Sequence, residues 1–205
     1  MAAADHYSSD IAFTPTVKAI QARKGSRKAY SHMEEGGSWS TRITPQLARF
    51  IAAQTSAFLA TANSEGQPYV QHRGGPPGFL CVLDEETIAF TDFRGNRQYI
   101  TQGNLLENPK AYLFLIDYAR RERVKIWGRA RVIEGDNELI ARLMPGGYKA
   151  RAEQAVFFKV SAWDINCPRH IPRRFDAAEV AAMLASRDKR IRALKKKLAR
   201  LRGPD

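Results

Sequence analysis

The stretch that most restricts the fold of this chain is residues 123–133, RVKIWGRARVI, in which polar and apolar residues alternate. Successive side chains of a strand point to opposite faces of a sheet, so this alternation predicts a strand with one buried face. Shorter apolar runs bounded by turn residues predict six more strands, over residues 57–62, 67–72, 79–83, 88–91, 111–116 and 155–161. Hairpin turns, such as Asn63-Ser64-Glu65-Gly66 after the first run, predict a mainly β fold, an antiparallel barrel with peripheral helices.

Helix signals occur between some of these strands. Thr44 and Pro45 are typical of an N-cap and a first helical residue, and Pro15 predicts a short helix that ends at Gly25-Ser26, with Arg27 solvated. Further helices are expected over residues 97–106 and 138–143, and after Asp176. We therefore predict an N-terminal arm with a short helix over residues 1–43, a barrel over residues 44–175, and a basic C-terminal helix over residues 176–205.

Residues 88–109 combine a strand, a turn and a helix start in a way that suits an anion. The strand breaks at Gly95-Asn96, and the expected helix begins at Arg97. The first helical turn has free N–H groups and a partial positive charge, and an arginine adds a planar, permanently charged fork. This corner predicts a binding site for the phosphate of a cofactor.

The positive charge of the chain is concentrated at one end. The net charge is +12, yet residues 187–202 contain nine Lys or Arg and one Asp, so the remaining residues contribute only +4. Two cysteines and no long apolar run favour a cytoplasmic protein without a disulfide framework. With 205 residues, 44% of them hydrophobic, the chain can bury a substantial core.

Several motifs resemble those of the pyridoxamine 5′-phosphate oxidase-related flavin-binding proteins. They are residues 69–76 (YVQHRGGP), 95–99 (GNRQY), 103–105 (GNL) with Asn108-Pro109, 115–118 (LIDY), 121–128 (RERVKIWG) and 163–168 (WDINCP). Their order and spacing extend the resemblance over residues 14–175. The resemblance implies a split β-barrel, a homodimer, and FMN bound in a groove between the two subunits.

The resemblance also implies roles for individual residues. Thr91 corresponds to a threonine beside the flavin ring, and Asn96 and Arg97 to a basic pair that binds the FMN phosphate. Since Asn96 carries no charge, Arg73 or His72 is expected to supply the second cation. Arg123 and Lys125 correspond to polar groups near the pyrimidine end of the ring, where a cation stabilises reduced flavin. The full expected FMN-binding set is Gln71, His72, Arg73, Gly74, Thr91, Asp92, Asn96, Arg97, Gln98, Arg123, Lys125 and Trp163.

Two functions fit these features. The first is an FMN-dependent oxidoreductase that transfers hydride between flavin and a small-molecule substrate or a nicotinamide; the second is a non-catalytic module that binds flavin or haem. The spacing of side chains identifies no catalytic set, and the substrate stays open. Cys167-Pro168-Arg169-His170 resembles half of a metal site, but without a second Cys/His pair we expect no metal. The family resemblance places residues 163–170 near the dimer groove. There, either Arg169 or His170 faces the substrate, or both belong to a packed, hydrogen-bonded loop.

The C-terminal helix carries a heptad seam. Its members recur at spacings of four and three: Val180, Leu184, Arg187, Ile191, Leu194, Leu198 and Leu201. Such a seam predicts a coiled-coil pair or docking onto the barrel. The surrounding Lys and Arg side chains also allow contact with nucleic acid or an acidic membrane, although a solvated face on a dimerising helix is the simpler interpretation.

Overall fold

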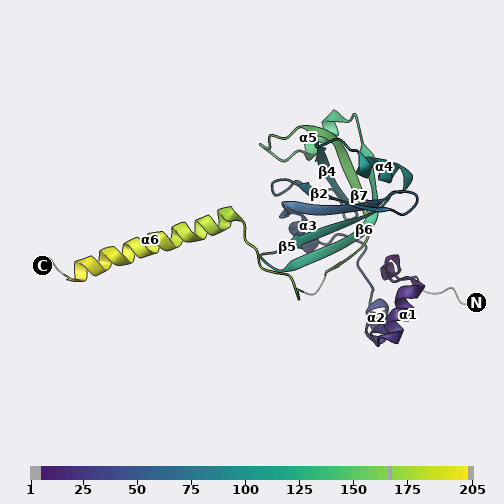
Figure 1. The fold of residues 1–205 in the computed structure, drawn as a ribbon, viewed down its shortest axis with the longest axis horizontal. Coiled ribbons are helices and arrows are strands. Elements are labelled where there is room, and N and C mark those ends of the chain that lie inside the picture. The colour runs from purple at the N-terminus through teal and green to yellow at the C-terminus, as the bar shows by residue number, and fades with distance from the viewer. Residues whose placement is uncertain (1–5, 166–167, 203–205) are drawn as a thin grey trace, which may run out of the picture.

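The computed structural model describes residues 6–165 and 168–202, and within these residues seven strands form one antiparallel sheet (Figure 1). The strands are β1 (Ser56–Ala62), β2 (Pro68–Gly74), β3 (Cys81–Val82), β4 (Thr87–Phe93), β5 (Lys110–Asp117), β6 (Glu122–Ile133) and β7 (Ala152–Ile165). Their order across the sheet is β2-β1-β5-β6-β7-β4-β3, so β2 and β3 form its two edges. The predicted mainly β, antiparallel fold is confirmed. The sheet curls without closing, as a split barrel does.

The described helices lie around the sheet and at both ends of the chain. They are the 3-10 helix η1 (Ser8–Ile11) and the α-helices α1 (Pro15–Arg23), α2 (Arg27–Glu35), α3 (Pro45–Ala52), α4 (Ile100–Glu107), α5 (Asn137–Leu143) and α6 (Ala177–Arg202). The predicted start of α3 is confirmed, because Thr44 Oγ1 accepts a hydrogen bond from the Leu47 N–H and Pro45 is the first helical residue. The sequence did not predict η1 or α2.

The main core fills the concave side of the sheet. Its fully buried side chains come from strands on both sides of the curl and from α3, and include Ile51, Leu59, Phe90, Leu113 and Phe158. Along β6, buried and less buried residues alternate as the period of two predicted. Close packing of these side chains fixes the curvature of the sheet.

The strand predicted over residues 79–83 is mostly wrong. Only Cys81 and Val82 pair with β4, whereas Phe79 and Leu80 are buried in the core. The Phe79 N–H donates to Pro76 O at 3.0 Å, which turns the chain inward there. A Cβ atom at Gly75 would lie 2.6 Å from Phe79 Cβ, so this packing requires glycine. The first residues of this apolar run therefore pack in the core instead of pairing in the sheet.

A corner in the sheet occurs at Gly128. The pairing of β6 with β7 shifts register between Trp127 and Gly128, the signature of a β-bulge. A Cβ atom at Gly128 would lie 2.1 Å from Lys159 O and 2.5 Å from the Phe158 ring. The close crossing of β6 and β7 at this corner is therefore possible only with glycine.

The opposite side of β2, β1, β5 and β6 forms a surface that we call the outer face. Residues paired across these strands make two rows, Val70–Ala60–Tyr112–Trp127 and His72–Phe58–Phe114–Lys125. On β1, β5 and β6 their neighbours along the strand are buried in the core, so these side chains point away from it. Val70 is 58% exposed, and Phe58, Tyr112, Phe114 and Trp127 are half-buried. The outer face is thus an apolar surface that the described chain covers only in part.

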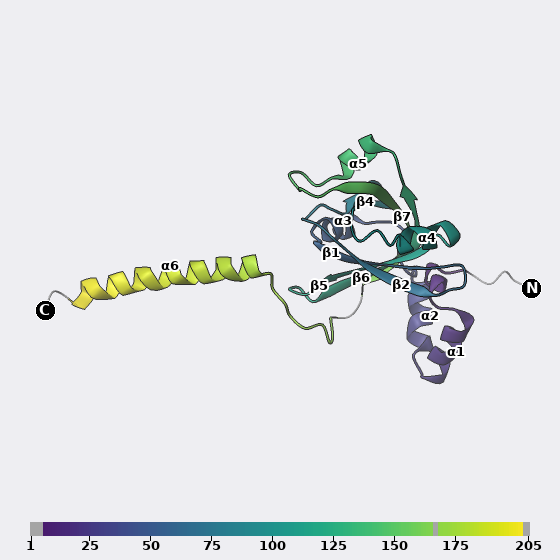
Figure 2. The same ribbon diagram turned by 45° about the horizontal axis from the view of Figure 1, so that its top comes forward.

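The arm, consisting of η1, α1 and α2, packs as a small helical unit beside the sheet (Figures 1 and 2). It is joined to β6 by Trp39, which stacks on Trp127 with a centroid distance of 4.6 Å. Trp39 also contacts the ring of Phe13 at 4.9 Å. The arm therefore borders one end of the outer face.

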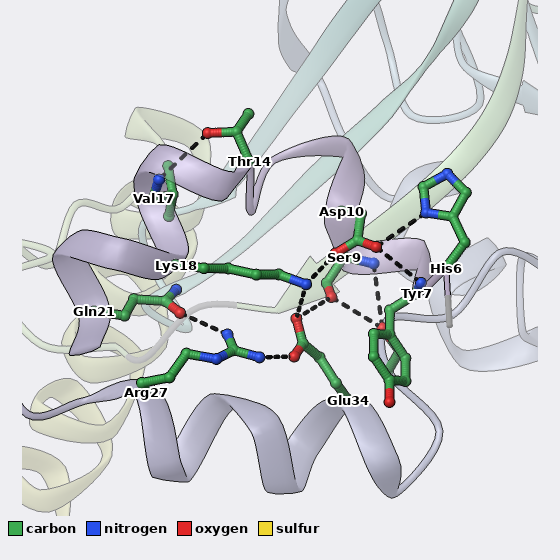
Figure 3. Close-up of polar contacts among 11 residues, drawn as sticks. His6, Tyr7, Ser9, Asp10, Thr14, Val17, Lys18, Gln21, Arg27 and Glu34 are labelled. Carbon is green, nitrogen blue, oxygen red and sulfur yellow. Dashed lines mark hydrogen bonds and ion pairs between the residues drawn. The ribbon is translucent and has the colours of Figure 1, made fainter. Parts of the chain in front are cut away.

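A buried polar network holds the arm together (Figure 3). Glu34, only 2% exposed, pairs with Arg27 and with Lys18 Nζ at 3.3 Å, and accepts a hydrogen bond from Ser9 Oγ at 3.1 Å. Lys18 Nζ also contacts Asp10 Oδ1 at 2.6 Å. The expectation that Arg27 is solvated was wrong, because its guanidinium lies between Glu34 and Gln21, whose Oε1 accepts from Arg27 Nη1 at 2.7 Å.

Helix α6 extends away from the sheet in both views (Figures 1 and 2). Residues 177–201 are all exposed. Among the described helices, none combines the length and the hydropathy that a bilayer span requires.

Candidate functional site

An ion pair joins two strands that are not neighbours in the sheet. Arg73 on β2 pairs with Asp92 on β4, although β1, β5, β6 and β7 separate these strands in the sheet order. Both side chains are nearly buried, 12% and 11% exposed. Gln154 Nε2 on β7 donates to the second carboxylate oxygen of Asp92 at 3.0 Å. The curl of the sheet therefore brings β2 against β4, and this contact spans the split of the barrel.

A small cleft of about 50 Å³ lies beside this ion pair. Strand β2, the end of β4, the β4–α4 loop (residues 94–99), the first turn of α4 and β7 line it. The cleft brings together six of the predicted site residues: Gln71, Arg73, Asp92, Asn96, Arg97 and Gln98. The two loop motifs that the sequence singled out thus meet in one place.

The β4–α4 loop has an unusual backbone. Arg97 and Tyr99 both adopt left-handed conformations, with φ of 60° and 55°. Such conformations cost energy for residues other than glycine and are concentrated at functional sites. They also correct the predicted helix start, because α4 begins at Ile100 instead of Arg97. Arg97 therefore belongs to the loop that precedes the helix.

The first turn of α4 faces the cleft. Its N-cap, Tyr99, makes no side-chain capping hydrogen bond, and Thr101 and Gln102 line the cleft. The N–H groups of a first helical turn have no acceptor within the helix. Thr101 Oγ1 donates to Gln71 Oε1 at 2.8 Å, which fixes this turn against β2. The predicted combination of helix N–H groups and arginine is present, although the helix starts three residues later than expected.

Each arginine of the cleft has a carboxylate nearby. Arg97 Nε donates to the Tyr99 hydroxyl at 2.8 Å, and that hydroxyl donates to Glu153 Oε1 at 2.9 Å. Arg97 Nε lies 3.9 Å from the same Glu153 oxygen. With Asp92 beside Arg73, the charged side chains lining the cleft sum to zero. An anion that enters must therefore compete with carboxylates for both arginines.

Sequence reasoning missed Tyr99, Thr101, Glu153 and Gln154. The first two lie within the motif that was singled out, and their polar side chains beside Arg97 were a usable signal. The other two reach the cleft only because β7 pairs with β4, Gln154 opposite Asp92. That pairing joins residues about sixty positions apart, and no local pattern specifies it.

Three other predicted residues, His72, Thr91 and Gly74, lie near the cleft but do not line it. His72 lies on the outer face, where its ring nitrogen is 2.7 Å from Ser56 Oγ. Thr91 is buried on the far side of β4, and its hydroxyl donates to Ile140 O in α5 at 3.2 Å. Alternation along each strand explains both, since Arg73 and Asp92 face the cleft. Gly74, at the end of β2, has the His72 ring and Thr55 O within 3.3 Å of the position of an added Cβ.

Arg123 and Lys125 lie on β6, in a different environment. Lys125 Nζ is 2.7 Å from Asp164 Oδ2 and lies over the rings of Trp39 and Trp127, at 5.4 and 5.3 Å. Burial raises the pKa of the nearby Tyr112 to about 12, while the charge of Arg123 acts in the opposite direction. Neither cation lines the cleft.

Trp163 lines a separate, larger cavity of about 590 Å³ between α3 and the β5–β6 turn. Its indole N–H donates to Arg42 O at 2.8 Å. Cys167 of the half metal motif lies outside the described residues. Within residues 6–165 and 168–202, no group of three His, Cys, Asp or Glu side chains is arranged to hold a metal ion.

Comparison with known proteins points to one family. The family model described as Pyridoxamine 5′-phosphate oxidase matches residues 43–167. Comparison with curated proteins finds no match.

The solved structures that the chain resembles are distant in sequence. The chain is 15% identical to HupZ of Group A Streptococcus over 64% of this chain and 99% of that chain, with a TM-score of 0.49. It is 18% identical to a putative pyridoxamine 5′-phosphate oxidase of Lactobacillus delbrueckii (61% and 95%, TM-score 0.48). It is 16% identical to the heme storage protein HutZ of Vibrio cholerae (61% and 94%, TM-score 0.41). These likenesses are too distant to bear on function.

Proposed function

The chain belongs to the pyridoxamine 5′-phosphate oxidase family, and we propose that it binds FMN with the phosphate group in the cleft between β2 and the β4–α4 loop. The observation that carries the proposal is the meeting of Arg73, Arg97 and the first turn of α4 in one cleft. A helix start next to arginines recognises phosphate by N–H donors, dipole and charge together.

The donors available in the cleft fit a phosphate. The hydrogen bond and the ion pair of Arg97 both use Nε, so its terminal nitrogens extend beyond these contacts. The side chain of Arg97 is 54% exposed and has freedom to turn. Arg73 is held differently, because Asp92 fixes its guanidinium from one side and its Nε is buried without a hydrogen-bond partner among the described residues. We assign Arg97 as the cation that moves and Arg73 as the fixed one.

The size of the cleft suits the phosphate alone. At about 50 Å³ it is far smaller than the roughly 300–1,000 Å³ typical of pockets that enclose a whole ligand. The flavin ring would therefore lie outside the cleft, against a surface completed by a second molecule. The outer face, with its half-buried aromatic side chains, supports a homodimer as the source of that second molecule.

With FMN bound, we propose that the protein is an oxidoreductase for a small-molecule substrate or a nicotinamide. Bound FMN supplies a ring that accepts and returns a hydride. The contribution of this chain is to fix the phosphate end and to exclude water from one side of the ring. Lys125 and Arg123 are the cations proposed for the ring, although Asp164 already neutralises Lys125 within one subunit. They would serve this role only at the boundary between two subunits.

Titration with FMN and with riboflavin tests the proposal directly. Riboflavin has the same ring but lacks the phosphate, so we expect quenching of flavin fluorescence at much lower FMN than riboflavin concentration. Equal affinities for FMN and riboflavin would show that the cleft does not recognise the phosphate. If the protein binds neither flavin, the proposal that it is a flavoprotein is wrong. Anaerobic mixing of the FMN-loaded protein with NADH, NADPH or pyridoxamine phosphate then tests catalysis through loss of the flavin colour. Stable colour with every donor would favour the non-catalytic binding module.

A further inference from the structure

The exposed seam of α6 carries an inference that is independent of the flavin site. The six apolar members of the seam are between 39% and 76% exposed: Val180, Leu184, Ile191, Leu194, Leu198 and Leu201. They lie along a helix of 26 residues, about 39 Å at 1.5 Å per residue, that stands away from the sheet (Figures 1 and 2). In the part of the chain that the structure describes, neither the barrel nor the arm covers them.

The width of the seam indicates whether its partner is a helix or a membrane surface. The alternating spacings of four and three place every apolar seam residue at an a or d position of a heptad, with Leu184, Ile191 and Leu198 at a. From Asp188 onward charged side chains flank the seam directly, with Arg190 and Lys197 at g and Asp188 and Lys195 at e, whereas Ala181 and Met183 flank its first heptad. A strict a/d stripe is the seam of a coiled coil, whereas a helix lying on a membrane presents a wider apolar face. The geometry thus favours a second helix over a lipid surface.

The charge of α6 decides between a second copy and a different partner. The helix contains nine Lys or Arg and two acidic residues, a net charge of +7. In a parallel pair of identical helices, Arg190 at g faces Lys195 at e of the other copy, and like charges at these positions destabilise the pair. An antiparallel pair brings the same two +7 helices together.

We propose that α6 binds an acidic amphipathic helix of another protein, as one strand of a heterotypic coiled coil. The partner carries apolar residues at its a and d positions and Glu or Asp at e and g, opposite Arg190, Lys195 and Lys197. Arg187 occupies a d position within the seam, so the partner offers a carboxylate at that layer. A polar layer of this kind fixes the register of the two helices.

A pair of synthetic peptides about four heptads long tests the proposal on the full-length protein. Both have Ile at a and Leu at d, except for a single Glu at the d layer opposite Arg187; one has Glu at e and g, and the other has Lys there. We expect the acidic peptide to bind about tenfold or more tightly than the basic one by calorimetry, and to weaken as salt is raised. The variant Leu194→Asp/Leu198→Asp should abolish binding, and Arg190→Glu/Lys195→Glu/Lys197→Glu should reverse the preference between the peptides.

Other occupants give different results. Sedimentation velocity that shows self-association through α6, lost in Leu194→Asp/Leu198→Asp, would overturn the proposal in favour of a second copy. Tighter binding to phosphatidylserine vesicles or to duplex DNA than to the acidic peptide would overturn it as well. The seam residues of α6 touch neither the sheet nor the cleft, so these variants keep the near-ultraviolet circular dichroism and FMN binding of the parent.

Discussion

Arg97 is the residue on which the proposed phosphate site most depends. Its guanidinium is exposed and, among the described residues, is held by Tyr99 and Glu153, so it can turn toward an anion. We expect Arg97→Ala to weaken FMN binding about 10- to 100-fold, since a hydrogen bond to a charged group contributes about 1.5–3 kcal/mol, and to leave riboflavin binding unchanged. Glu153→Gln should instead tighten FMN binding a few-fold, because it removes the carboxylate that competes for Arg97.

Arg94 provides the matched control for these titrations. It belongs to the same loop and carries the same charge, but it does not line the cleft. Arg94→Ala should therefore leave both affinities at the parent value. A loss in Arg94→Ala as large as in Arg97→Ala would mean that the loop attracts FMN only through its general positive charge.

At the level of single residues, the sequence predicted the cleft better than the direction of each side chain. Gln71, Arg73, Asp92, Asn96, Arg97 and Gln98 were expected together and lie together. The neighbours His72 and Thr91 point to other surfaces, because adjacent residues of a strand face opposite sides. The family resemblance identified which residues lie near the site. The alternation of side chains along each strand, which is visible in the sequence, shows which of them point into the cleft.

Among the elements, the arm depends on ionised carboxylates. Lys18, with His6, lowers the pKa of Asp10 from 3.8 to about 2. For Glu34, burial raises the pKa, but hydrogen bonds from Arg27, Lys18 and Ser9 outweigh it and lower the pKa from 4.5. Carboxylates whose pKa is lowered in the folded state stabilise it above their ordinary pKa, and this stability is lost as the pH falls through the folded-state pKa.

We therefore expect the arm to separate from β6 between about pH 4 and pH 2. Trp39 reports the change, because it is buried between Phe13 and Trp127 and its fluorescence shifts on exposure. The variant Asp10→Asn/Glu34→Gln has no carboxylates to protonate there and should lack this step. An acid transition of equal size in both proteins would assign it to the sheet.

The elements also show where sequence patterns fail. Strand β6 and helix α3 were predicted well, since period and capping residues specify them locally. Helix α2 escaped prediction because its stabilising contacts, Glu34 with Lys18 and Ser9 and Arg27 with Gln21, are with other parts of the arm. The start of α4 was misplaced because the left-handed residues Arg97 and Tyr99 extend the loop.

For the whole molecule, the outer face predicts how two chains associate. If it is the homodimer interface, Phe114→Glu places a carboxylate on this face between Phe58 and Lys125 and should convert the dimer to a monomer in sedimentation velocity. Because the flavin ring is proposed to lie at that interface, this variant should also lose FMN affinity. Leu83→Glu, at another exposed apolar position, should change neither property. A Phe114→Glu protein that still sediments as a dimer would exclude the outer face as the homodimer interface.

The order of the strands lay beyond sequence reasoning for a physical reason. Hairpin neighbours such as β1 and β2 follow from short turns, whereas the pairing of β4 with β7 and the approach of β2 to β4 depend on how the core closes. Packing of side chains such as Phe90 and Phe158 decides that closure. The architecture was predictable, but the contact across the split that creates the cleft was not.

The corner at Gly128 has a consequence for how such a protein can change over generations. Strands β6 and β7 pass through it, and they carry both the outer face, through Trp127, and the cleft, through Gln154. Since only glycine fits at the crossing, an insertion or a larger side chain there would move the two surfaces together. A descendant can remodel its loops freely, but it inherits the cleft and the outer face as a single unit.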